Sequence, residues 1–134
     1  MSIRSRLAII ALPAALALGV LGTAVPVHAA TVNAVTVSGH CSRTSLTDLQ
    51  VQREDTGKLS IDFGVDMARH TAGVAWKVRM TDNGILFANT TKLTIADGSF
   101  SMTRLITPQV GLNHIVASAL NPLTGETCRL TATL

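Results

Sequence analysis

The stretch KLSIDFGVDM, residues 58–67, decides the fold class of this 134-residue chain. From Leu59 to Met67 every second residue is apolar, and the residues between them are polar or glycine. A period of two residues places the apolar side chains on one face of an extended segment and the polar ones on the other. The stretch therefore predicts a β-strand that packs one face on a core and leaves the other in water.

The same alternation extends in both directions from this strand. Val74–Thr81 and Thr127–Leu134 alternate as clearly, and turn residues separate the alternating segments. Among these turns, Asn83-Gly84 is the strongest short hairpin signal. The pattern predicts seven strands: Leu46–Arg53, Lys58–Met67, Val74–Thr81, Ile85–Ile95, Ser99–Ile106, His114–Leu120 and Thr127–Leu134.

These strands predict an all-β domain over residues 41–134. About seven short strands in roughly 100 residues are typical of a single immunoglobulin-like β-sandwich. A small β-barrel would give the same pattern and is the alternative architecture. The large apolar residues on the inward faces predict the core, which we expect to contain Trp76, Phe63, Ile61, Val78 and Leu130.

Two cysteines, Cys41 and Cys128, are the only ones in the chain. Cys41 precedes the first of the seven strands and Cys128 lies near the start of the last. If those two strands run parallel, their starts meet at one end of the sandwich, and we expect a disulfide there. The bridge would close a loop of 88 residues (128 − 41 + 1). The rival interpretation is that the two cysteines remain thiols and bind a metal ion. Such a site needs further ligands at close spacing, and the sequence has none there.

Residues 1–29 have the pattern of a signal peptide that is cleaved on export. Arg4 and Arg6 precede an apolar run, and Val27-His28-Ala29 supplies a cleavage site. The apolar run is also long enough to be an uncleaved anchor, although its proline and glycines favour cleavage. Because Ser5 separates the two arginines, the pattern indicates the general secretory pathway and a secreted, extracellular protein.

Residues 30–40 form an N-terminal extension before the disulfide-closed domain. The segment Thr31–Val37 is uncharged and β-prone. It predicts either an extra strand of the domain's own sheet or an exposed edge that pairs with another chain, including a second copy. In the second case Val32, Val35 and Val37 would form the partner-binding edge.

The charge composition argues against polyanionic partners. The whole chain has 11 basic and 8 acidic residues, a net charge of +3. Loss of Arg4 and Arg6 with the signal leaves 9 against 8, a net charge of +1. Such a small charge predicts no binding to nucleic acid and none to a membrane after cleavage. The chain also has one Trp, three Phe and no Tyr, too few for a stacking platform.

The sequence lacks a recognisable catalytic or metal-binding constellation. His40, His70 and His114 are far apart in the chain, and neither an HExxH nor a GxSxG motif is present. Asp62 and Asp66 share one strand face, but about 13 Å separates them, more than the roughly 5–9.5 Å between glycosidase carboxylates. We therefore expect a protein that is not an enzyme and that has no catalytic residue, no cofactor and no metal.

Several segments together resemble a known group of proteins. They are the run around Trp76, the Asp82-Asn83-Gly84 turn, Gly98-Ser99-Phe100, Ile115-Val116-Ala117 and, most specifically, the segment NPLTGETC at 121–128. Over residues 40–134 the chain resembles small secreted actinobacterial proteins of uncharacterised function with an immunoglobulin-like or fibronectin-III-like sandwich. The resemblance implies the fold, bacterial origin and export, and it implies no activity.

These observations predict a secreted, non-catalytic binding or structural module whose ligand or cell-envelope partner is unknown. A secreted enzyme inhibitor or an undetected enzyme is the alternative. Inhibition would need an exposed rigid loop, for which Asp66–Gly73 and Thr107–Asn113 are the candidates. A small-molecule carrier is a further alternative, which would require a sizeable apolar pocket.

Overall fold

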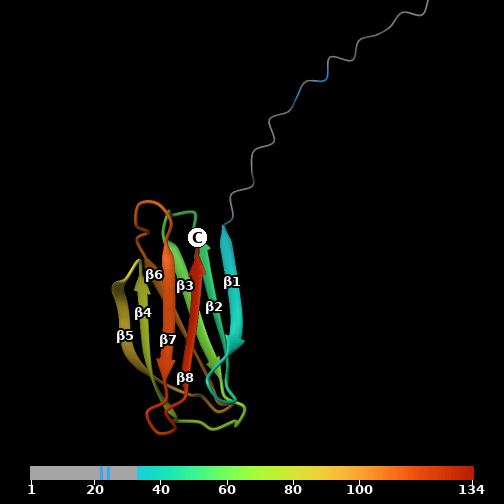
Figure 1. Cartoon of the computed structure of the whole chain (residues 1–134), viewed down its shortest axis with the longest axis vertical. Coiled ribbons are helices and arrows are strands. Elements are labelled where there is room, and N and C mark those ends of the chain that lie inside the picture. The colour runs from blue at the N-terminus through green and yellow to red at the C-terminus, as the bar shows by residue number, and fades with distance from the viewer. Residues whose placement is uncertain (1–21, 23, 25–32) are drawn as a thin grey trace, which may run out of the picture.

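The protein is a sandwich of two four-stranded antiparallel sheets (Figure 1). The structure, a computed structural model, describes residues 22, 24 and 33–134. The predicted signal segment, residues 1–29, and Val32 lie outside the described residues, apart from residues 22 and 24. The all-β sandwich prediction is confirmed, with eight strands where about seven were expected.

The strands follow the predicted segments closely. Their bounds are β1 Ala34–His40, β2 Leu46–Arg53, β3 Leu59–Asp66, β4 Ala75–Asp82, β5 Ile85–Leu93, β6 Ser99–Ile106, β7 His114–Leu120 and β8 Thr127–Thr133. Sheet A has the order β1-β2-β3-β6 and sheet B the order β5-β4-β7-β8. Each neighbouring pair is antiparallel.

The chain passes several times between the two sheets of the sandwich. The first three strands stay together in sheet A, and the chain then crosses between the sheets after β3, β5 and β6. In the immunoglobulin order ABED the second strand, B, lies between A and a later strand, E. Counted from β2, the first of the seven predicted strands, β3 lies in the same way between β2 and the later strand β6, and β1 is an additional strand at the edge beside β2.

The β4–β5 hairpin shows how local sequence determines the register. Asn83 and Gly84 both have positive φ, 48° and 82°, as a two-residue type I′ turn requires. The turn sets Asp82 opposite Ile85. Its twist matches that of the flanking strands, which is why Asn-Gly is favoured here.

The core lies between the sheets, where the predicted apolar residues are buried. Phe63, Ile61, Trp76 and Val78 have no exposed surface, and Leu130 is 9% exposed. An aromatic cluster occupies the centre, with the ring of Phe100 6.4 Å from Phe63 and 6.1 Å from Trp76. In β2, β7 and β8 the alternation of the sequence becomes alternating burial, whereas the last residues of β4 and β6 depart from it.

Strand β1 pairs with β2 of its own sheet along its whole length. Val35 and Val37 are half-buried and pack against the core. The two valines of the predicted partner-binding edge that the structure describes therefore face inward. The exposed side of β1 presents the intervening residues, which are small or polar.

Candidate functional site

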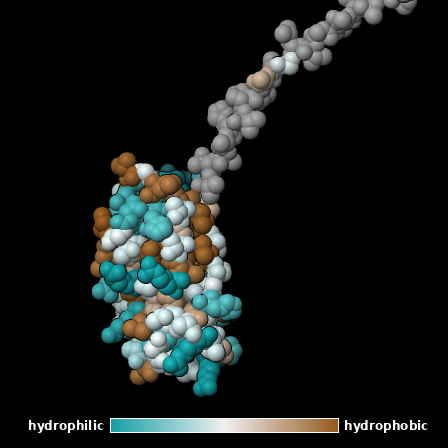
Figure 2. Space-filling view, viewed as in Figure 1, coloured by the Kyte–Doolittle hydropathy of each residue, from teal (hydrophilic) through white to brown (hydrophobic). Residues whose placement is uncertain are grey.

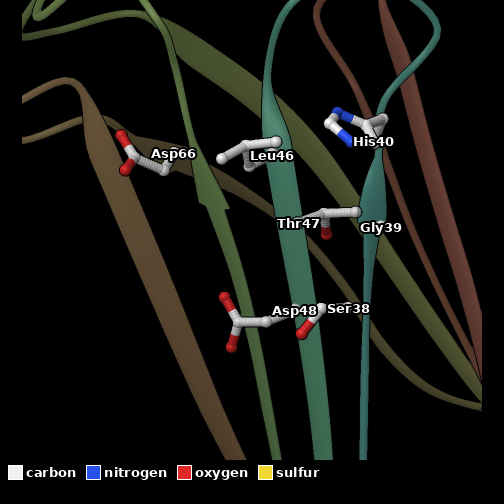
Figure 3. A pocket seen from close by; sticks show the side chains of 7 residues that line it. All are labelled: Ser38, Gly39, His40, Leu46, Thr47, Asp48 and Asp66. Carbon is white, nitrogen blue, oxygen red and sulfur yellow. The ribbon is translucent and has the colours of Figure 1, made fainter.

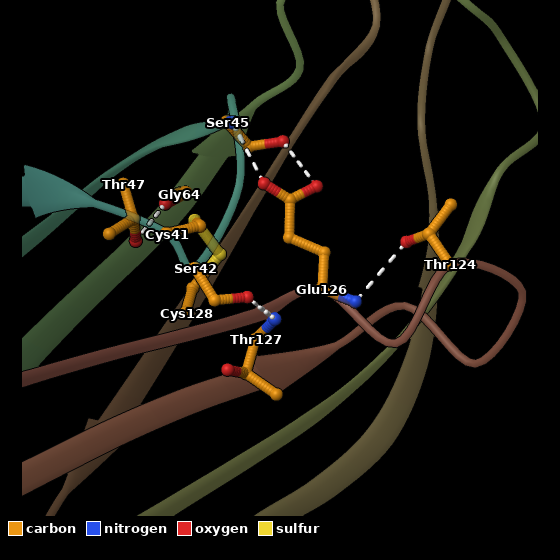
Figure 4. Close-up of a disulfide and its surroundings, with 9 residues drawn as sticks. All are labelled: Cys41, Ser42, Ser45, Thr47, Gly64, Thr124, Glu126, Thr127 and Cys128. Atoms are coloured by element: carbon orange, nitrogen blue, oxygen red, sulfur yellow. Dashed lines mark hydrogen bonds between the residues drawn. A yellow bond between two sulfur atoms is a disulfide. The ribbon is translucent and has the colours of Figure 1, made fainter.

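One end of the sandwich is closed by the disulfide between Cys41 and Cys128, which confirms the predicted pairing (Figure 4). Their Cα atoms are 4.2 Å apart. The backbone N–H of Ser42 donates to the carbonyl oxygen of Thr127, and the N–H of Thr127 donates to Ser42 Oγ. The start of β8 is thus fastened to the segment between β1 and β2 by a covalent bond and by hydrogen bonds.

Glu126 reinforces this closure with a buried carboxylate (Figure 4). It is 4% exposed, and its Oε1 and Oε2 accept hydrogen bonds from Ser45 N–H at 2.8 Å and Ser45 Oγ at 3.0 Å. Ser45 is itself buried, so the carboxylate satisfies donors that water does not reach. Sequence reasoning missed this residue, because a Glu that directly follows a turn glycine is usually solvated.

The opposite end of the sandwich carries the loop Thr107–Asn113, which is braced from within. Asn113 has no exposed surface, and its Oδ1 accepts a hydrogen bond from Gln109 N–H at 2.8 Å. Its Nδ2 donates to the carbonyl oxygen of Gly111 at 3.3 Å. Gln109 Nε2 in turn donates to the carbonyl oxygen of Asp82. These bonds hold the loop in one shape on the end of β4.

Apolar side chains project from this braced loop and from the neighbouring β4–β5 turn. Val110 is fully exposed and Leu112 is 72% exposed, and neither side chain is covered by another described residue to any large extent. Ile85, 61% exposed, lies just beyond the turn that Asn83 Nδ2 ties to the carbonyl oxygen of Leu112. Figure 2 shows brown, apolar side chains at this upper end of the molecule. We call Ile85, Leu86, Val110 and Leu112 the apolar tip.

A carboxyl group without a partner lies beneath the apolar tip. Asp82, the last residue of β4, is 3% exposed, and neither of its carboxylate oxygens has a hydrogen-bond partner among the described residues. Burial raises the pKa of Asp82 above its ordinary value, and the nearby backbone and charge of His114 offset part of this rise. The carboxylate is therefore a source of instability at the end of the sandwich that carries the loop.

We expect Asp82→Asn to stabilise the protein at neutral pH. The pKa of Asp82 is higher in the folded protein than in the unfolded chain, so the folded protein binds the Asp82 proton more tightly. The stability of the wild type therefore falls as the pH rises from 3.8 through the raised pKa. The amide has no charge to bury, so the variant should gain about 1 kcal/mol above that window and nothing below it. Urea unfolding from pH 3 to 8 measures this, with the exposed turn variant Asp55→Asn as control. A variant less stable than wild type at pH 7 would contradict the assignment.

The three histidines of the described chain are not assembled into one site. His70 Nδ1 lies 2.7 Å from the carbonyl oxygen of Asp97, and His114 Nδ1 lies 3.0 Å from Thr133 Oγ1. His40 and His70 line a common shallow hollow near Asp66. Among the described residues, no three His, Cys, Asp or Glu side chains are placed to hold a metal ion.

The outer face of sheet A is polar and carries only acidic charges. The register of the strands places Asp48 between Ser38 and Gly64, and it places Asp66 opposite Leu46. Asp48 and Asp66 both line a shallow hollow that also includes His40 (Figure 3). Asp62, which shares this strand face with Asp66, accepts a hydrogen bond from Thr103 Oγ1. The two aspartates noted in the sequence thus have different partners.

Comparisons with known proteins add no relative to this picture. No family model matches the chain, and no significant match was found to a curated protein or to a solved structure. In the part of the chain that the structure describes, no helix has the length and apolar character needed to cross a membrane. The class that the fold defines is a disulfide-closed β-sandwich of two antiparallel sheets.

Proposed function

We propose that this chain is a secreted, non-catalytic binding module of the bacterial cell exterior, with an immunoglobulin-like architecture. The observation that carries the proposal is the apolar tip: exposed Val110 and Leu112 on a loop pinned by buried Asn113. Exposed apolar groups gathered on one surface are typical of interaction sites. The internal bonds fix the loop in advance, which reduces the entropy lost on binding.

The tip fits a protein partner that has an apolar groove. The tip is made of side chains that project from a loop and a turn, and the segment Thr107–Asn113 contains no charged residue. A loop without charge gains nothing from an anionic surface, so burial of Val110 and Leu112 in a partner's groove supplies the affinity. Burying a Val or Leu side chain removes its apolar surface from water, which is worth about 1.5–3 kcal/mol.

We expect the double substitution Val110→Ser and Leu112→Ser to abolish partner capture without unfolding the domain. In this experiment the full chain is expressed in its host and collected after export. The protein is then immobilised and exposed to the envelope fraction and culture fluid of the same host. Loss of two exposed apolar anchors should weaken binding at least tenfold, because each anchor removed costs about 1–2 kcal/mol. Both side chains are exposed, so the melting temperature should stay unchanged.

Leu123→Ser is the matched control, because Leu123 is 84% exposed at the disulfide end. A specific partner is retained by wild type and by Leu123→Ser and is lost from the double variant. Equal capture by all three proteins would refute the role of the tip. Flotation with neutral phosphatidylcholine vesicles that depends on Val110 and Leu112 would instead show insertion into lipid and overturn the proposed protein partner.

Enzyme inhibition through the same loop is the second candidate function. Both loops that the sequence offered are held by hydrogen bonds, and Thr107–Asn113 is the one that also exposes large apolar side chains, Val110 and Leu112. An inhibitor would lower the turnover of a hydrolase from the same culture fluid. The double substitution Val110→Ser and Leu112→Ser would then abolish this inhibition. A simple binding module would leave that turnover unchanged.

A further inference from the structure

We propose that the outer face of sheet B is a binding site for a linear polymer of phosphate groups. The site is independent of the apolar tip, which lies on loops at one end of the sandwich. Its central residues are Lys77 and Arg79 of β4 and Arg129 of β8, all exposed. Together with Asn89, Ser118 and Thr127 they line one open hollow on this face. We call this set the basic groove.

The register of sheet B brings the cations together. Arg79 lies opposite Ser118 of β7, and Ser118 lies opposite Arg129, so the two arginines share one row with a serine between them. With strands about 4.8 Å apart, their Cα atoms are about 10 Å from each other. Lys77 lies two residues along β4, about 7 Å from Arg79. The long side chains of these residues can therefore reach one chain of anions.

Charges of one sign are gathered on each outer face of the sandwich. The outward positions of β5, β4, β7 and β8 include no Asp or Glu, while those of sheet A include Asp48, Asp62 and Asp66 and no Lys or Arg. The three cations of the basic groove thus have no carboxylate on their own face to neutralise them. Their mutual repulsion is relieved when an anion binds, which is the condition for an electrostatic binding site.

The residue types favour phosphate. A guanidinium group presents a planar fork that binds phosphate oxygens in pairs. Ser118 lies between the two arginines, but its hydroxyl donates to the carbonyl oxygen of Arg79, so the cations themselves bind the phosphates. Aromatic side chains for stacking bases are missing from the groove, because Trp76 and Phe63 are buried in the core. A polymer recognised here is therefore read through its phosphates and not through bases.

A second copy of the chain fits the groove less well, although its acidic face has the complementary charge. That face is itself hollowed around Asp48 and Asp66 (Figure 3). Two hollowed faces leave a gap when they meet, whereas a linear polymer lies within one of them. Shape therefore selects the polymer over the copy.

The test is titration of the secreted protein with inorganic polyphosphate in 0.15 M NaCl, followed by calorimetry and by amide chemical shifts. We expect binding that weakens as salt rises, with shifts at Asn89 and Ser118. The triple variant K77Q/R79Q/R129Q should bind at least tenfold more weakly. The matched variant R43Q/R53Q/R69Q loses the same charge from positions outside the groove and should bind as wild type does.

Each other outcome overturns the proposal. Equal loss in both triple variants would show a general charge effect, and the absence of binding would show no site. Equal affinity for polyglutamate would remove the preference for phosphate, and tighter binding of a single-stranded oligonucleotide would show that bases are read. Concentration-dependent self-association that is lost only in K77Q/R79Q/R129Q would assign the face to a second copy. None of these results depends on Val110 or Leu112, so the test is separate from that of the apolar tip.

Discussion

Replacing both Cys41 and Cys128 by alanine should lower the free energy of unfolding by about 4.5 kcal/mol. The bridge joins residues 87 positions apart, and the entropy that it removes from the unfolded chain grows with the logarithm of this separation. A domain of this size has a total stability of about 5–15 kcal/mol, so the loss is a large fraction of the whole. Urea unfolding at pH 7 with linear extrapolation measures it.

Wild-type protein unfolded in the presence of a reductant is the matched control for this variant. It should unfold at the same urea concentration as the alanine variant, because both lack the cross-link. A variant that loses less than 1 kcal/mol would show that the unfolded chain is already restricted near Cys41 and Cys128. The circular dichroism of the folded variant should still show β-structure, since the core side chains are unchanged.

Glu126→Ala should cost about 3 kcal/mol, the second largest effect that we expect. The substitution removes both acceptors of Ser45 and leaves a buried N–H without a partner. A lost hydrogen bond to a charged group costs about 1.5–3 kcal/mol, and an unpaired buried donor adds to that. The same urea measurement applies, and Leu123→Ala serves as a control in the same turn, because the Leu123 side chain is 84% exposed.

Glu126→Gln separates the hydrogen bonds from the charge. The amide retains one oxygen acceptor for Ser45 N–H, so the variant should lose less than half of the energy lost by Glu126→Ala. Glu126 and the disulfide fasten the same two segments, and we therefore expect their effects not to add. A combined variant that loses the full sum would contradict this coupling.

The strand pattern was predictable because each strand has one wet face and one buried face. The segment 58–67 shows a period of two residues, and burial in β3 follows this period except at Gly64, which lies against Asp48. The Asn83-Gly84 turn was predictable for a similar reason, since few residues accept its backbone angles. Local rules were sufficient wherever the two sides of a segment have different surroundings.

The chemistry at the two ends of the sandwich was not predictable from local pattern. Glu126 and Asp82 are both acidic residues beside turns, and both are buried: one has two hydrogen bonds, the other none. Their burial depends on segments that are distant in the chain, which alternation does not reveal. The buried Asn113 is likewise a loop residue by sequence and a structural brace by contact.

The net charge did not reveal how the charged residues are distributed between the two outer faces of the sandwich. A sum of +1 after loss of the signal residues predicted no electrostatic partner, because it averages over directions. The register assigns Lys77 and Arg79 to one outer face and Asp48 and Asp62 to the other. The alternation within each strand already shows which charged residues point outward. The pairing of the strands was needed to assign these residues to one sheet or the other and so to obtain the charge of each outer face.

The outward side chains of the strands make sheet A the acidic face of the domain and sheet B the basic face. Near a charged solid or a cell wall such a molecule turns before it touches, so that it lands flat on one sheet. The disulfide end and the apolar tip then lie along the surface, and the other sheet points away from it. One side of the layer that forms is acidic and the other is basic. The charge of the solid surface therefore determines whether the layer exposes its acidic or its basic sheet.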